Sequence, residues 1–125
     1  MLKIANDSLY NHKLKENHRF PMIKYELIPE QLLRENTCNQ YNFFTPGEID
    51  DNVILLTHDI IYYDKLIKQQ LEKKELRAIG FPMSNKLIER EKKIVQGTIE
   101  CSLHSKNFGI SMNIAGGTHH AFTNR

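Results

Sequence analysis

A length of 125 residues is enough for one domain with a sizeable apolar core. Hydrophobic residues make up 40% of the chain and charged residues 26%, a balance typical of a folded soluble protein rather than of a disordered or membrane-embedded one. The net charge of +2 is too small to indicate nucleic acid binding, and the lysines of residues 86–93 alternate with Glu89 and Glu91, a pattern typical of a solvated helix face.

The first half of the chain predicts short strands around one helix. Residues 2–5 form an apolar run that fits a first strand, and the polar residues 10–20 fit a loop. A helix is expected over residues 21–36, because proline suits a first helical turn, although Pro29 should kink or divide it. Residues 43–45 then fit a brief strand before a Pro-Gly turn.

The middle of the chain predicts a strand followed by a capped helix. Residues 53–56 have the composition of a buried strand, although four apolar residues also fit a helical turn. Thr57 or Asp59 can cap the next helix, whose apolar positions keep helical spacing as far as Leu71. The Gly-Phe-Pro sequence of residues 80–82 ends this pattern.

The longest expected helix lies near the C-terminus. Ser84 is a candidate N-cap and Gly109 a stop signal, and residues 110–115 follow as an apolar strand. The stripe expected to be buried on this helix consists of Leu87, Ile88, Ile94, Val95, Thr98, Ile99 and Leu103. Strand, helices and strand in this order predict an α/β fold in which residues 2–5 and 110–115 are parallel strands of one sheet, with the helix packed on it.

The two cysteines and the N-terminus indicate the compartment. Cys38 and Cys101 lie far apart and in no metal or redox spacing, so we expect reduced thiols in a cytoplasmic protein, with a disulfide as the alternative. The first residues lack the apolar run of a signal peptide, and no stretch approaches the length of a membrane span.

The sequence Gly-Gly-Thr-His-His directly after the last expected strand is the main candidate site. In open α/β sheets the ligand crevice lies beyond the carboxyl ends of the strands. The glycine pair Gly116 and Gly117 permits unusual backbone angles, so that His119 and His120 can face one pocket and transfer protons near neutral pH. The alternative is a pair of surface histidines. Zinc ligation by this pair alone is not expected, because a catalytic zinc takes three protein ligands.

Four stretches together resemble the N-terminal part of the histone deacetylase superfamily, and most closely its class IV branch and bacterial acetoin-utilisation-type relatives. They follow the order found in that family and span almost the whole chain, which makes the combination specific. The stretches are His-Arg-Phe-Pro-Met-Ile-Lys-Tyr at 18–25, Leu-Arg-Ala-Ile-Gly-Phe-Pro at 76–82, Gln-Gly-Thr-Ile at 96–99 and Asn-Ile-Ala-Gly-Gly-Thr-His-His-Ala at 113–121.

The resemblance implies a parallel-sheet, three-layer α/β fold of the arginase/deacetylase type and zinc-dependent hydrolysis of acyl-lysine amides. It implies that His120 is the general base and then the acid, with His119 as its electrostatic partner at the same water. Arg19 matches an arginine that lines an internal product cavity, and Gly117 and Phe81 are assigned to the same substrate and product channel. The alternatives are a solvated loop residue for Arg19 and a core or loop anchor for Phe81.

Departures from the family pattern limit what this chain can do alone. Residues 80–82 lack the aspartate that holds substrate in classical members, as in class IV. In the family, the metal ligands are two aspartates and a histidine, and they lie downstream of the histidine pair. The carboxylates that orient this pair also lie downstream, as does the tyrosine that stabilises the transition state. We therefore expect residues 1–125 to be a truncated N-terminal portion, inactive by itself, with the zinc ligands downstream and an acylated protein lysine or small acylated amine as substrate. The alternatives are a non-catalytic chain that acts by association and an acetylpolyamine-type amidohydrolase.

Overall fold

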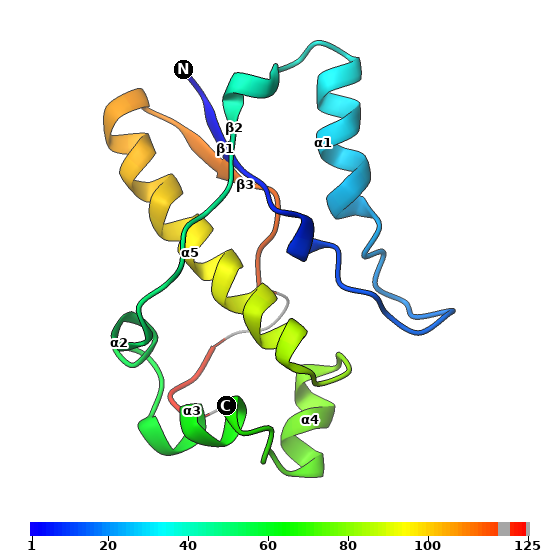
Figure 1. The fold of residues 1–125 in the computed structure, drawn as a ribbon, viewed down its shortest axis with the longest axis vertical. Helices are drawn as coiled ribbons and strands as arrows, with labels where there is room; N and C mark the ends of the chain where they lie inside the picture. The colour runs from blue at the N-terminus through cyan, green and yellow to red at the C-terminus, as the bar shows by residue number, and fades with distance from the viewer. Residues whose placement is uncertain (118–120, 125) are drawn as a thin grey trace.

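The computed structural model describes residues 1–117 and 121–124, and these form a mixed α/β fold around a small parallel sheet (Figure 1). The strands are β1 (Lys3–Ala5), β2 (Phe43–Phe44) and β3 (Ser111–Asn113). Their order is β2-β1-β3, and both pairings are parallel. The predicted α/β class is therefore confirmed, as is the parallel pairing of the first and last expected strands.

Five α-helices surround this sheet within the described residues. They are α1 (Lys24–Arg34), α2 (Asp51–Ile54), α3 (Ile60–Ile67), α4 (Lys73–Ile79) and α5 (Asn85–Phe108). In Figure 1, α5 crosses the sheet diagonally, α1 stands to one side, and α3 and α4 lie at the opposite end of the molecule from β2. None of the helices in this part of the chain has the length and apolar character needed to cross a membrane.

The two faces of the sheet are distinguished by the strand register. Ala5 pairs with Phe44 on one side and Asn113 on the other. The Phe44 ring lies 4.8 Å from that of His104 on α5, and the Asn113 amide donates to the Ile94 carbonyl of α5 at 3.0 Å. Side chains alternate along a strand, so Ala5, Phe44 and Asn113 face α5, whereas the next residues of each strand face away.

Helix α5 begins and ends as predicted, but its buried stripe differs from the prediction. The Ser84 hydroxyl accepts from the Leu87 amide at 3.1 Å, and Gly109 ends the helix with a φ of 80°. Val95 is 44% exposed and Leu103 is 55% exposed. The stripe that packs inward includes Leu87, Ile88 and Ile94 as predicted, together with Arg90, Gly97 and Cys101.

Three other expectations were wrong or incomplete. Residues 53–56 are not a buried strand: they lie at α2 and the turn after it, and Leu56 is 85% exposed. Asp50, whose side chain accepts from the Asn52 amide, caps this short helix. Pro29 does not divide α1, which continues from Lys24 to Arg34. Helix α4 was not anticipated.

The core closes around a cluster of aromatic and aliphatic side chains where the N-terminal loop meets α5. Its buried members are Tyr10, Met22, Tyr25, Ile94 and Ala115, and Leu14, Phe20, Phe81 and Ile114 pack against them. This cluster joins segments from both ends of the chain, so long-range contacts rather than local propensity define the centre of the fold. Cys38 and Cys101 are both free thiols.

Candidate functional site

The first and second of the four resembling stretches meet through His18. Its Nδ1 accepts from the Phe20 amide at 3.1 Å, so its Nε2 carries the proton and donates to the Gly80 carbonyl at 3.3 Å. Gly80 ends α4 with a φ of 73°, a conformation that favours glycine. One histidine therefore connects two segments that lie 62 residues apart.

Phe81 contributes an aromatic ring to the same contact between the two segments. Its ring lies 5.3 Å from that of Phe20 and 5.7 Å from that of His18, and it packs against the core cluster. This agrees with the loop-anchor alternative for Phe81. Arg19 lies between these contacts with an exposed side chain, and Gly117 is exposed beyond β3. The assignment of Arg19, Gly117 and Phe81 to a channel remains a prediction.

The third and fourth stretches meet where α5 crosses the end of β3. The Asn113 amide donates to the Ile94 carbonyl at 3.0 Å and to Thr98 Oγ1 at 3.1 Å, and its Oδ1 accepts from the Ala115 amide at 3.3 Å. A Cβ atom on Gly97 would lie 2.9 Å from Asn113 Nδ2 and 2.7 Å from the Tyr10 hydroxyl. A side chain at position 97 would force these atoms to shift, so the contact of Gly97 with Asn113 helps to position the chain after β3.

Arg90 lies inside the protein at the same end of the sheet. It is 1% exposed, and its Nε donates to the Tyr10 carbonyl at 2.8 Å. Its guanidinium lies 5.1 Å from the centre of the Tyr25 ring and forms an ion pair with Glu91. A buried arginine with these contacts holds the N-terminal loop against α5. The prediction of a solvated face for the lysines of residues 86–93 did not anticipate that Arg90, in the same segment, is buried.

Two titratable side chains beside Arg90 are held in their neutral forms. Burial raises the pKa of the Tyr10 hydroxyl well above 10, with a further contribution from the charge of Asp7. Burial, followed by the charges of Arg90 and Lys86, lowers the pKa of His12 below its ordinary value of 6.5. His12 is therefore an uncharged imidazole at neutral pH.

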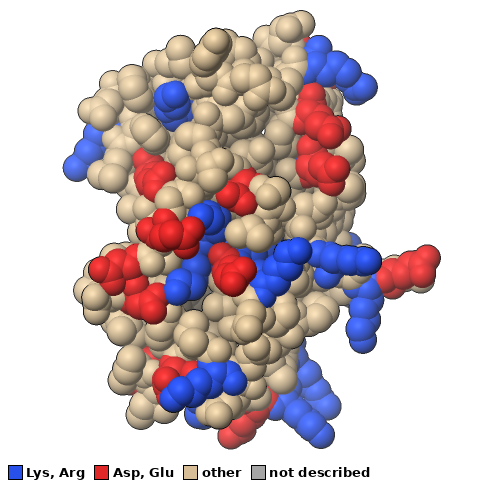
Figure 2. All heavy atoms as spheres, viewed as in Figure 1, with Lys and Arg blue, Asp and Glu red and all other residues tan. Residues whose placement is uncertain are grey.

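The remaining lysines of this helix segment form ion pairs near the surface. Lys92 pairs with Asp51 at 2.5 Å and Lys93 with Glu48 at 2.6 Å. The contact with Lys92 lowers the pKa of the Asp51 carboxyl, and the contact with Lys93 lowers that of Glu48. Figure 2 shows acidic and basic side chains intermixed across the middle of this face, where α5 and α2 meet.

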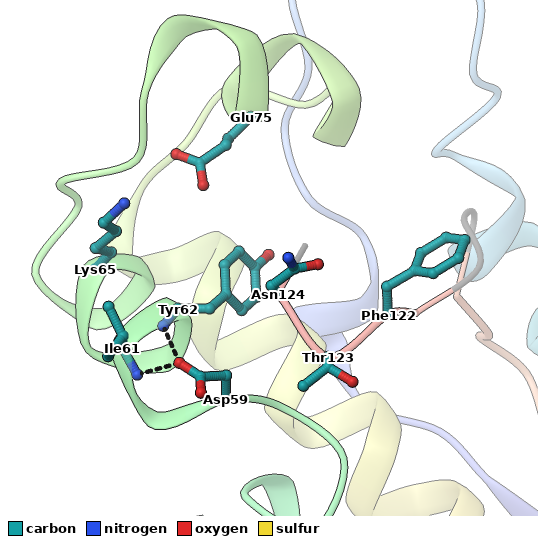
Figure 3. Close-up of a pocket in the computed structure, with 8 residues that line it drawn as sticks. All are labelled: Asp59, Ile61, Tyr62, Lys65, Glu75, Phe122, Thr123 and Asn124. Atoms are coloured by element: carbon teal, nitrogen blue, oxygen red, sulfur yellow. Dashed lines mark hydrogen bonds between the residues drawn. The ribbon is translucent and has the colours of Figure 1, made fainter.

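An open groove of about 640 Å³ lies between α3, α4 and the C-terminal segment (Figure 3). The Asp59 amide donates to the Thr123 carbonyl at 2.7 Å, which ties that segment to the start of α3. Burial, followed by the charge of Glu75, raises the pKa of Tyr62. The residues that line the groove are Asp59, Ile61, Tyr62, Lys65, Glu75, Phe122, Thr123 and Asn124.

The predicted catalytic pair, His119 and His120, lies outside the described residues. The described neighbours are Ala115, buried in the core cluster, and Thr123, held at α3. Across residues 1–117 and 121–124, no three His, Cys, Asp or Glu side chains lie close enough together to hold a metal ion.

Sequence reasoning missed Arg90, Tyr10 and His12 as interior residues. The signal for Arg90 was its spacing, because it falls three residues after Leu87 and four before Ile94, in register with the inward stripe. Its charge pointed instead to solvent. Tyr10 and His12 carried no such signal, since they lie where the chain leaves its first strand without a regular period.

Comparison with known proteins leaves the family open. No model of a known protein family matches the sequence. The chain is 34% identical over 113 residues to an uncharacterized protein of Picosynechococcus sp., a match that covers 90% of this chain and 38% of that relative. The chain thus spans well under half the length of the relative.

Proposed function

We propose that this chain is the N-terminal portion of a zinc-dependent deacylase of the histone deacetylase superfamily, with the three-layer arginase/deacetylase fold. The observation that supports the proposal is the contact between the stretches that carry the resemblance. His18 bonds to Gly80, Gly97 packs on Asn113, and Ala115 shares a core cluster with Tyr25. These three contacts bring the four stretches together in one part of the fold.

The length of the relative also supports a portion of a larger protein, because the matched region makes up 38% of it. In this proposal the substrate is an acylated protein lysine or a small acylated amine such as an acetylpolyamine. The reaction adds water to the amide carbonyl and breaks the C–N bond, so a carboxylate and an amine are formed.

The proposed roles within this chain concern protons and the path of the substrate. His120 takes a proton from the attacking water and returns it to the leaving amine, and His119 stabilises the charge that develops beside it. Arg19 and Gly117 line the route by which the carboxylate product leaves. Phe81 borders the substrate entrance from its position against Phe20.

In this proposal the zinc ligands lie in polypeptide that follows this chain, as the resemblance implies, and the residues that the structure describes contain no three-ligand cluster of their own. Proton transfer by histidines accelerates a reaction by a factor of roughly 10² to 10⁴. Enzymes typically accelerate their reactions over the uncatalysed rate by a factor of about 10⁶ or more. The 125-residue chain should therefore show neither stoichiometric zinc nor turnover.

The test compares the 125-residue chain with the longer protein, meaning the gene product that contains this chain and the polypeptide that follows it. Both are assayed for zinc by elemental analysis and for release of a fluorogenic acyl-lysine and of an acetylated polyamine. We expect zinc and chelator-sensitive turnover only in the longer protein, with a loss of about 10² to 10⁴ in kcat for His120→Ala. His104→Ala, which removes a histidine of α5 that packs on Phe44, is the matched control.

Two outcomes contradict the proposal: a reading frame that ends at Arg125, or a longer protein that binds no metal and cleaves neither substrate. Zinc-dependent turnover by the 125-residue chain itself would instead contradict the assignment of the metal ligands to polypeptide outside it. The ratio of the two substrate activities separates a protein deacylase from an acetylpolyamine-type amidohydrolase.

A second candidate, a non-catalytic chain that acts by association, is favoured by one observation. Several large apolar side chains are exposed, including Leu56 at 85%, Ile61 at 67% and Ile110 at 59%. Sedimentation of the purified chain at several concentrations tests this candidate, which requires a defined complex in the absence of any further polypeptide.

A further inference from the structure

The groove between α3, α4 and the C-terminal segment has a charged end and an apolar end. Figure 3 shows Lys65 and Glu75 at one end and Phe122 at the other, with Tyr62 and Asn124 between them. Its volume of about 640 Å³ is in the range of pockets that hold small molecules, roughly 300 to 1,000 Å³. Phe122 is 46% exposed and follows the predicted catalytic pair by two residues in the sequence. A ligand in the groove would therefore place one end among charges and the other beside the segment that follows this pair.

The two charges at the first end face each other without forming an ion pair. In Figure 3 the Lys65 ammonium and the Glu75 carboxylate both project into the space between α3 and α4. None of the ion pairs formed among residues 1–117 and 121–124 includes either side chain. Glu75 Oε2 accepts from the Glu72 amide at 2.6 Å in the first turn of α4, which leaves Oε1 for a ligand. The groove therefore offers a cation on one side and a carboxylate oxygen on the other.

Tyr62 forms part of the wall beside the charged end. Its ring lies 5.5 Å from that of His58, which packs against it. Burial, followed by the charge of Glu75, raises the pKa of the Tyr62 hydroxyl, so this hydroxyl is uncharged at neutral pH. The second carboxylate of the groove, that of Asp59, is engaged in the cap of α3, since its Oδ1 accepts from the Ile61 amide at 2.8 Å. Glu75 is therefore the carboxylate better placed to bind a ligand at this end.

We propose that this groove binds an amino acid whose ammonium and carboxylate are both free, and that its ligand is free Nε-acyl-lysine. The ligand carboxylate pairs with Lys65 and the α-ammonium pairs with Glu75. The aliphatic chain runs past Tyr62 and Asn124 toward Phe122, which directs the acyl amide toward the segment that carries the histidine pair. The inference rests on the proposed function for the acyl amide, and it narrows the substrate of that site from acylated amines in general to an acylated amino acid.

Other acylated amines fit the charges of the groove less well. An acylated polyamine carries positive charges only, so Lys65 would repel it. An acyl-lysine within a protein has amides in place of both α charges, so it would leave Lys65 and Glu75 without partners. Charge complementarity therefore favours the free amino acid.

The test compares three acetylated ligands that share one carbon framework and differ in charge. Nε-Acetyl-lysine carries both α charges, acetylcadaverine carries the ammonium alone, and ε-acetamidocaproate carries the carboxylate alone. Each is titrated into the isotope-labelled 125-residue chain while the amide resonances of Tyr62 and Asn124 are followed by NMR. We expect Nε-acetyl-lysine to have the lowest Kd. Each single-charge ligand should bind about threefold or more weakly, because one exposed ion pair is lost.

Two variants that remove a charge assign each charge of the ligand to its partner. Lys65→Met should weaken binding of Nε-acetyl-lysine by about threefold or more, without weakening that of acetylcadaverine. Glu75→Gln should weaken Nε-acetyl-lysine similarly, without weakening ε-acetamidocaproate, and its amide oxygen can still accept from the Glu72 amide. Lys68→Met, on the loop side of Lys65 and paired with Asp64, is the matched control and should change none of the affinities. Circular dichroism of each variant checks that the fold is retained.

Three results would overturn the inference. The first is the absence of shifts at Tyr62 and Asn124 with every ligand. The second is equal affinity for the three ligands, which would show that the groove does not recognise both charges. The third is tightest binding of acetylcadaverine, which would identify a polyamine-type ligand instead. These readouts require neither zinc nor turnover, so a longer protein that cleaves no acyl amide would contradict the proposed function and leave the binding result intact.

Discussion

The inward face of α5 buries a charged residue, whereas the region that contains α2 and α3 exposes large apolar residues. On α5, the charged Arg90 is 1% exposed and Ile94 is 3% exposed, and Gly97 is buried between them and β3. In the other region, Leu56 in the turn after α2 is 85% exposed and Ile61 on α3 is 67% exposed. Residue type alone would have placed the leucine and isoleucine inside and the arginine outside. The comparison shows that burial in this protein follows position relative to the sheet.

The two regions also differ in what stabilises them. At the inward face of α5, hydrogen bonds from Arg90 and Asn113 connect three segments that are distant in sequence. At α3 the principal local feature is the Asp59 side chain, which accepts from the Ile61 amide at 2.8 Å. Substitutions should therefore be costly in the first region and mild in the second.

The largest loss is expected for Arg90→Ala. The substitution removes the bond to the Tyr10 carbonyl and the packing of the guanidinium on Tyr25, and should lower the free energy of unfolding by about 3 kcal/mol. Arg90→Met retains most of the buried volume and should lose about half as much. Urea denaturation measures both. Equal losses would show that the hydrogen bond, rather than packing, dominates.

A somewhat smaller loss is expected for Gly97→Ala. Alanine is the better helix former, but its Cβ would lie 2.7 Å from the Tyr10 hydroxyl and 3.0 Å from Pro46 Cγ. The crowding should outweigh the helix gain of up to about 1 kcal/mol and leave a net loss of about 2 kcal/mol. Ser102→Ala, exposed on the same helix, is the control and should be neutral or slightly stabilising. A stabilised Gly97→Ala would show that the contact relaxes easily.

In the second region the cap should account for most of the local effect. Asp59→Ala removes the acceptor for the first amides of α3 and should cost about 1 kcal/mol in thermal or urea unfolding. Thr57→Ala, two residues earlier and not a cap, should change stability by less than about 0.5 kcal/mol. Similar losses for both variants would mean that the connection between α2 and α3, rather than the cap, matters.

The free energy of unfolding should depend on pH through His12, which lies in the interior near Arg90. Burial lowers the pKa of His12 below 6.5, so the unfolded chain binds this proton more tightly than the folded chain does. The stability that results is present above pH 6.5 and is lost as pH falls from 6.5 toward the folded pKa. His12→Asn should flatten the dependence of the unfolding free energy on pH between 7.5 and 5.5, as measured by urea denaturation at several pH values. An unchanged slope in this variant would contradict the assignment to His12.

The smallest effect is expected at the most exposed apolar side chain of the second region. Leu56→Ser should change the free energy of unfolding of the 125-residue chain by less than about 0.5 kcal/mol, because the leucine is 85% exposed. A loss of more than 1 kcal/mol in the same urea experiment would mean that Leu56 is covered in solution.

Much of the framework could be predicted from local signals. The first strand, the brief second strand and the last strand, the Asp59 and Ser84 caps and the Gly109 stop all agree with the structure. Each depends on neighbouring residues, through apolar runs or through side chains that satisfy helix-end amides. The error at residues 53–56 has the same origin, because four apolar residues fit a strand or a helical turn equally well.

The sequence by itself determined the α/β class, the parallel pairing of the first and last strands of the chain, and the residues of four recognisable stretches. Only the tertiary structure decided that His18 reaches Gly80, that Gly97 lies against Asn113, and that Arg90 is buried beneath the Tyr10 carbonyl. These contacts join residues that are up to 80 positions apart. Propensity and periodicity describe only near neighbours, whereas long-range contacts depend on how the sheet and α5 pack together.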